Sequence, residues 1–126
     1  MNQQNYDQIV DLLLKATKSE KISWEKISSK NGFGTNINNC CVTVSTSYDF
    51  TIDETSFSLT LSNTKGEEFA NYYSSENSDK NEYAKLRSLY YAVRDVVYRI
   101  TESENLIISG LKEVMKQSDE TAEIPY

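Results

Sequence analysis

The 126-residue sequence contains no histidine, one proline, four glycines and two cysteines. Without histidine the chain lacks the usual general base at neutral pH, and Ser-His and Cys-His nucleophilic pairs are excluded. Zinc sites built from cysteine and histidine are excluded too, because Cys40 and Cys41 are the only soft ligands. We therefore predict a non-enzymatic protein with no catalytic residue, no metal site and no cofactor.

Long apolar runs and clusters of basic residues are also missing. No stretch approaches the ~18 apolar residues that span a bilayer, and the run Ile9–Leu14 lacks the flanks of a signal peptide. We expect a cytoplasmic protein with reduced cysteines. Nineteen acidic against thirteen basic residues give a net charge of −6, which repels a phosphate backbone on average. Neither membrane association nor direct nucleic-acid binding is expected.

The strongest pattern that is present is an apolar stripe between Asp79 and Met115, interrupted by a charge only at Glu104. It repeats at alternating steps of four and three, at Leu86, Tyr90, Val93, Val97, Ile100, Ile107, Leu111 and Val114. One helix over residues 79–117 would be about 58 Å long, which exceeds the width of a domain of this size. Thr101-x-x-Glu104 has the spacing of a capping box, so we favour a break near Thr101–Ser103.

Period-two alternation predicts an antiparallel meander of four strands in the middle of the chain. The strands are expected at Lys21–Ser28, Cys40–Ile52, Ser56–Ser62 and Glu67–Tyr73, with Lys30–Asn39 as a loop. The second and third strands alternate with opposite parity. The loop between them, centred on Asp53-Glu54, must therefore contain an even number of residues. Asn63–Gly66 is expected to be a type I turn closed by a left-handed glycine.

An amphipathic helix from Gln4 to Lys18, capped by Asn2 or Asn5, is predicted to precede the meander. The fold class is therefore α+β. We expect the N-terminal helix, a four-stranded antiparallel meander and a long C-terminal helix, broken near residues 101–103, packed on one face of the sheet. Residues 1–117 are predicted to form one domain, and residues 118–126 a disordered acidic tail.

The runs Leu13–Lys18 and Lys21-Ile22-x-Trp24, followed by a meander and a long helix rich in Leu, Tyr and Val, resemble one group of proteins. These are small uncharacterised bacterial α+β proteins, some of which accompany mobile elements or defence and immunity loci. The resemblance implies no substrate and no catalytic residue. It favours a binding protein that acts on another macromolecule.

Two surfaces are candidates for binding. The first is the second half of the apolar stripe, which is either a cap on the core or an exposed interface and comprises Leu106, Ile107, Ile108, Leu111, Val114 and Met115. The second is a docking face rich in hydroxyl groups, for which a simply solvated sheet face is the alternative, and comprises Thr43, Ser45, Ser47, Ser58, Thr60 and Ser62.

Two other groups of residues have ordinary structural interpretations. Asp49, Asp53 and Glu54 lie at one turn but lack the spacing of an EF-hand, and acidic residues favour turns for conformational reasons. Adjacent cysteines in a strand point to opposite faces, so we expect Cys40 in the core and Cys41 on the polar face, without a disulfide.

Three hypotheses on function follow. The first is a non-enzymatic interaction or regulatory module that binds a protein partner and forms a homodimer through its C-terminal helical segment. The second is an acidic inhibitor that blocks a basic site on a nucleic-acid-processing protein. The third is a small-molecule-binding domain, with its site at the end of the sheet near Trp24 and Phe33.

Overall fold

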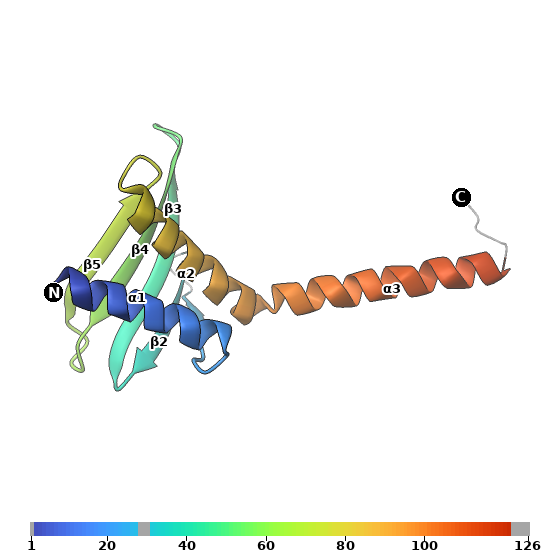
Figure 1. Cartoon of the computed structure of the whole chain (residues 1–126), viewed down its shortest axis with the longest axis horizontal. Coiled ribbons are helices and arrows are strands. Elements are labelled where there is room, and N and C mark those ends of the chain that lie inside the picture. Colours follow the sequence, from blue (N-terminus) through green and yellow to red (C-terminus); the bar gives the residue numbers. More distant parts are fainter. Residues whose placement is uncertain (1, 28–30, 122–126) are drawn as a thin grey trace.

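The computed structural model describes residues 2–27 and 31–121. The elements follow one another as α1 (Gln3–Lys18), β1 (Glu25–Ile27), β2 (Gly32–Ile37), β3 (Cys40–Asp49), β4 (Glu54–Ser62), β5 (Glu68–Ser75), α2 (Lys80–Tyr98) and α3 (Ile100–Thr121). The strands form one antiparallel sheet in the order β1-β2-β3-β4-β5. Helices α1 and α2 lie over one face of this sheet, and α3 extends away from it (Figure 1). The predicted α+β class and antiparallel sheet are confirmed.

The core lies between the two covering helices and the sheet. Val42 of β3 pairs with Leu61 of β4, Val44 pairs with Leu59, and all four side chains are buried. The opposite parity expected for these strands is therefore correct. The loop between the paired residues Asp49 and Glu54 contains four residues, an even number as parity requires, although Glu54 itself begins β4.

The outer end of the β3–β4 hairpin departs from the prediction. Strand β3 ends at Asp49 rather than Ile52, and the exposed fractions of Tyr48, Phe50 and Ile52 are 46%, 88% and 60%. In Figure 1 this hairpin rises beyond the end of α2, so the outer part of the apolar row has no helix to pack against.

The sheet has five strands rather than four, because β2 occupies most of the stretch predicted to be a loop. Phe33 of β2 pairs with Val44 and is buried, while Gly32 and Gly34 alternate with it on the other face. A Cβ at Gly32 would lie only 2.6 Å from the carbonyl oxygen of Val44, so the close strand contact requires glycine here. Two glycines close together favour a loop in sequence, but these two belong to a strand.

The boundaries of the first and last strands also differ from those predicted. Strand β1 comprises only Glu25–Ile27 of the strand expected at Lys21–Ser28, and β5 runs from Glu68 to Ser75. The turn before β5 is closed as expected by Gly66, whose φ is 82° and whose N–H bonds the carbonyl of Asn63 at 2.9 Å. The side chain of Phe69 in β5 is 57% exposed.

Side chains cap the first turns of α1 and α2, and the cap of α1 is one of the two expected from the sequence. The side chain of Asn2 accepts a hydrogen bond from the Asn5 N–H at 2.8 Å and begins α1 at Gln3. The Asp79 carboxylate accepts from the N–H groups of Asn81 and Glu82 and begins α2. Both helices therefore start where the sequence indicates.

The C-terminal region is two helices, so the predicted break is confirmed. It lies at Arg99, whose φ of 52° and ψ of 44° are left-handed, rather than at Thr101–Ser103. Thr101 does not cap α3, because its N–H and hydroxyl donate to the carboxylate of Asp95 at 3.1 and 2.9 Å. Helix α3 extends to Thr121, past the predicted start of the acidic tail, and residues 122–126 lie outside the described ranges.

Candidate functional site

Helix α3 carries an apolar surface that nothing in the described part of the chain covers. The exposed fractions of its large apolar side chains run from 49% at Ile108 to 67% at Leu106, and the set comprises Leu106, Ile107, Ile108, Leu111, Val114 and Met115. Every residue from Thr101 to Gln117 is exposed. The sequence allowed two interpretations of these residues, a cap on the core or an exposed surface. In the structure they form an exposed surface.

The apolar residues of α3 form a broad face because of their spacing. At about 100° per residue, Ile107, Ile108, Leu111, Val114 and Met115 fall within an arc of about 120°. Glu104 belongs to the same arc one turn earlier, and Leu106 lies outside it. The charged residues Glu113 and Lys116 lie on the opposite side of the helix. We call this surface of five residues the α3 face.

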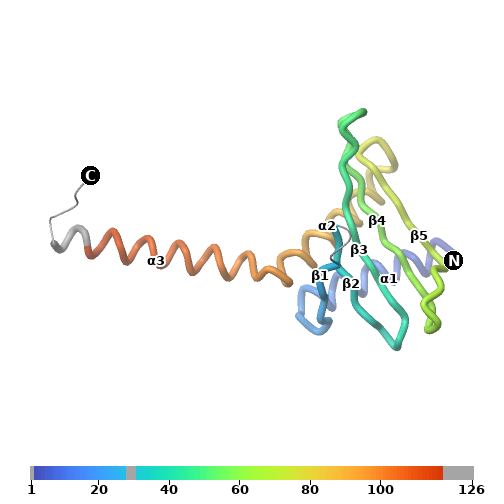
Figure 2. The backbone as a smooth tube through the Cα atoms, turned by 180° about the vertical axis from the view of Figure 1, so that it is seen from behind, coloured from blue at the N-terminus to red at the C-terminus, as the bar shows by residue number. Residues whose placement is uncertain are grey.

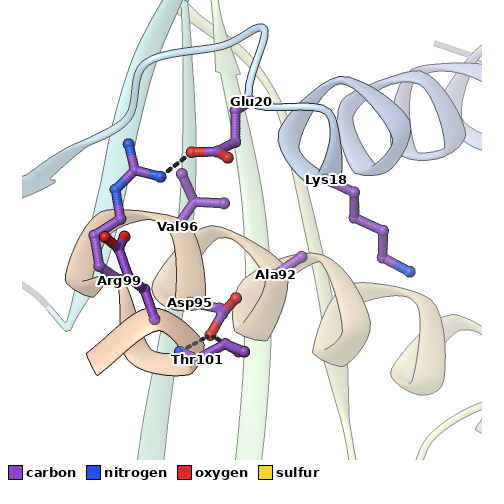
Figure 3. A pocket seen from close by; sticks show the side chains of 8 residues that line it. Lys18, Glu20, Ala92, Asp95, Val96, Arg99 and Thr101 are labelled. Atoms are coloured by element: carbon purple, nitrogen blue, oxygen red, sulfur yellow. Dashed lines mark hydrogen bonds and ion pairs between the residues drawn. The ribbon is translucent and has the colours of Figure 1, made fainter. Parts of the chain in front are cut away.

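The joint between α2 and α3 determines where this face points. The left-handed Arg99 turns the chain between the two helices, and its guanidinium pairs with the carboxylate of Glu20. Asp95 holds the first turn of α3 through Thr101, as Figure 3 shows. The N–H of Ser103 bonds the carbonyl of Arg99 at 2.8 Å. These contacts hold α3 in its extended direction.

A cavity of about 320 Å³ lies at the joint, beside the side chains drawn in Figure 3. Its polar groups are engaged with one another, since Arg99 pairs with Glu20 and Asp95 accepts from Thr101. Lys18 contributes a further charge from α1. The arrangement suits a structural joint that fixes α3 relative to α1 and α2.

The hydroxyl-rich residues are brought together on one face of the sheet, as the sequence predicted. Pairing places Thr43 opposite Thr60 and Ser45 opposite Ser58. Ser47 lies opposite Ser56, with 2.8 Å between the two hydroxyl oxygens, and Ser62 lies opposite Cys41. No helix covers this face in the described part of the chain, as the view from behind in Figure 2 shows. Its side chains are short, so the face is flat and polar.

The residues of the third hypothesis lie in the core. The exposed fractions of Trp24 and Phe33 are 7% and 2%. The Trp24 indole N–H donates to the Thr17 hydroxyl at 3.0 Å, and the Phe33 ring lies 5.7 Å from the ring of Tyr90. Neither aromatic ring is presented to solvent as a platform for a ligand.

The acidic turn and the cysteines take structural positions. Asp53 has a left-handed backbone and accepts a hydrogen bond from the hydroxyl of Tyr48. Within residues 2–27 and 31–121, no group of three or more His, Cys, Asp or Glu side chains is placed to hold a metal ion. Cys40 and Cys41 are free and half-buried. Cys40 was expected in the core, but it lies only partly inside it.

A second apolar surface, which was not predicted from the sequence, lies beside α1. It is a groove of about 510 Å³ with Ile9, Leu12 and Ala16 of α1 as one wall. Its floor is the end of the sheet, with Ile37, Val42, Leu61 and Phe69. Exposed fractions of 56% at Leu12 and 57% at Phe69 show that the groove is open. The sequence signal was Leu12 itself, which broadens the apolar stripe of α1 beyond one narrow face.

No family model, curated protein or solved structure matches this chain. Within the described residues, no helix is both long enough and apolar enough to cross a membrane.

Proposed function

We propose that this chain is a non-enzymatic protein-interaction module that forms a homodimer through α3. The observation that carries the proposal is the exposure of the α3 face on a helix that extends away from the domain. Contiguous exposed apolar surface on a protein marks an interaction site. Full burial of one such leucine, isoleucine or valine side chain contributes about 1.5–3 kcal/mol, so covering this face strongly favours association.

A second copy of the chain is the partner that this proposal names. Most soluble oligomers are homo-oligomers with closed symmetry, and a two-fold axis gives both copies the same contacts. An extended helix also presents its apolar residues without steric interference from its own domain. The opposite side of α3, with Glu113 and Lys116, stays in solvent in such a dimer.

The test replaces Leu111, which lies at the centre of the α3 face, with aspartate. We expect light scattering on the wild-type chain to give twice the mass of one chain at high micromolar concentration, and Leu111→Asp to give the mass of one chain. Lys116→Asp is the matched control, because it introduces the same carboxylate on the opposite side of α3 and should remain dimeric. A wild-type chain that is monomeric at this concentration contradicts the proposal.

A further inference from the structure

We propose that the groove beside α1 receives α3 of a second copy, and that the two copies exchange these helices reciprocally. This inference rests on the proposed function, because it requires α3 to associate with another copy. It adds the surface that α3 binds. The dimer then contains two identical helix-in-groove contacts rather than one contact between two α3 helices.

The groove is a vacant helix position on the face of the sheet that carries the helices. Helices α1 and α2 pack against each other there, and α1 has apolar residues on two sides. Val10 and Leu13 are buried in the core, whereas Leu12 is turned away from it and is 56% exposed. The sheet continues past α1 and forms the floor of the groove, where Phe69 is also exposed. A third helix beside α1 would cover both of these side chains.

The width of the α3 face fits such a position. A two-stranded coiled coil uses a narrow seam of two positions in each heptad, whereas a helix packed on a globular core has a broader apolar face. The α3 face has five large side chains within about 120° of arc, as the helical spacing requires. A narrow seam would leave Ile108 and Met115, or Ile107 and Val114, partly in solvent. A groove with a wall and a floor covers both edges.

Glu104 argues against a parallel pair of α3 helices. It lies on the same arc as Ile107, Ile108 and Leu111, so a parallel pair would place the two Glu104 carboxylates opposite each other. Like charges at such positions oppose pairing. The groove offers an alternative to this repulsion.

The charges near the groove complement those of α3. Lys15 and Lys21 are exposed near the end of α1, each one residue before a groove residue, Ala16 and Ile22. Glu104 lies in the first turns of α3, on the same arc as the α3 face and ahead of its apolar residues. If α3 runs antiparallel to α1, the Glu104 carboxylate approaches these two lysines while the apolar residues fill the groove. Such complementarity sets the register and direction of docking.

The joint at Arg99 keeps α3 out of the groove of its own chain, so a second copy supplies the helix that enters this groove. Arg99 and the bonds from Thr101 to Asp95 hold α3 in a direction that leads away from its own α1 (Figure 1). Reciprocal exchange across a two-fold axis lets each α3 enter the other groove without a change at Arg99. Because every helix and every groove is then occupied, the assembly closes at two copies.

The test uses a native thiol as a reporter of docking. Cys40 lines the groove, and it becomes the only native cysteine once Cys41→Ser is introduced. Single cysteines are then placed on the α3 face as Ile107→Cys, Leu111→Cys or Val114→Cys in the full-length chain. A disulfide forms only where two Cα atoms lie within about 7 Å, so mild oxidation followed by peptide mass spectrometry reports which residues meet. Lys116→Cys on the opposite side of α3 is the control.

We expect at least one α3 face cysteine to form a disulfide with Cys40 of another chain, and Lys116→Cys to form none. A bridge between two engineered cysteines, or a dimer in which none bridges to Cys40, overturns the groove assignment while the proposed homodimer stands. A Cys40 bridge within one chain overturns the exchange, because α3 then folds back on its own domain. A monomer without bridges overturns both proposals.

A second variant tests the groove without engineered cysteines. Leu12→Glu places a charge on the exposed wall of the groove, and we expect it to raise the dimer dissociation constant by about ten-fold or more, as for the loss of a central apolar contact. Gln4→Glu adds the same charge at an exposed position of α1 outside the groove and should leave that constant within about two-fold, as for a charge at a rim. Equal effects of the two variants contradict the groove.

Discussion

The indole N–H of Trp24 donates a hydrogen bond to the side-chain hydroxyl of Thr17, with 3.0 Å between the two atoms. Both side chains are buried, and this bond joins the segment before β1 to the last turn of α1. The only tryptophan of the chain is therefore an anchor that fixes α1 on the sheet, and its polar atom is satisfied inside the core.

Replacing Thr17 with valine should destabilise the domain. Valine keeps the shape of threonine but leaves the indole N–H of Trp24 buried without a partner, which costs about 1–3 kcal/mol. Urea unfolding followed by tryptophan fluorescence measures this loss. Thr17→Ser is the control, because it keeps the hydroxyl group and removes only a methyl. Equal midpoints for the two variants would show that the hydrogen bond contributes nothing.

Core and α3 leucines should respond differently to truncation. Leu89 is fully buried in α2, so Leu89→Ala should lower the free energy of unfolding by about 2–5 kcal/mol. Leu106 is 67% exposed, so Leu106→Ala should change the free energy of unfolding by less than about 0.5 kcal/mol at a concentration where the chain is monomeric. Denaturant titrations of both variants give this comparison. A large loss from Leu106→Ala would place α3 in the core of the monomer.

Alkaline pH should destabilise the chain through Tyr6. Burial, with Glu82 and Asp7 nearby, raises the pKa of its phenol to about 12. An unfolded tyrosine has a pKa of about 10, so the stability due to the neutral phenol is complete below that pH. It is lost as the pH rises through the folded value of about 12. Urea unfolding at a series of alkaline pH values should show this fall.

Tyr6→Phe tests the assignment of that fall. Among the described residues the Tyr6 hydroxyl has no hydrogen-bond partner, so its removal should leave stability at neutral pH unchanged or higher. The alkaline fall should become shallower, and a remainder should persist because burial also raises the pKa of Tyr90. An unchanged slope between about pH 10 and 12 would assign the fall to other groups.

Gly110→Ala should raise the helix content of α3. A Cβ at Gly110 would meet no atom within 4 Å, so alanine fits without strain. Alanine favours a helix interior over glycine by about 1 kcal/mol. Far-ultraviolet circular dichroism should show more helix, while the unfolding midpoint of the domain core stays the same. Unchanged helix content would indicate that α3 is already fully formed.

The central meander could be predicted because its residues alternate within a single strand. Val42, Val44, Leu59 and Leu61 show this period in sequence and point into the core as expected. Strand β2 could not, because Gly32 and Gly34 carry no side chain that shows a period. The place of Gly32 in the sheet also depends on the close approach of β3, a contact that no local pattern records.

The position of the helix break was approximate for a related reason. Thr101 and Glu104 have capping-box spacing, but the structure uses Thr101 to bind Asp95, six residues earlier. The turn falls at Arg99, whose left-handed backbone is unusual for an arginine. The groove could not be predicted as a surface, although Leu12 stands out as an extra apolar residue of α1, because Leu12 and Phe69 are far apart in the chain and lie at one surface only in the folded domain.

The extension of α3 from the domain also affects how its affinity for a partner would arise. In proteins, most of the stability of a helix comes from packing of its apolar face rather than from intrinsic helix propensity. Helix formation in α3 and association are therefore parts of one thermodynamic cycle, and a measured affinity includes the free energy of ordering the helix. A substitution on the solvent side of α3, such as Glu113→Gly, can then lower the affinity through helix propensity alone, without altering any contact.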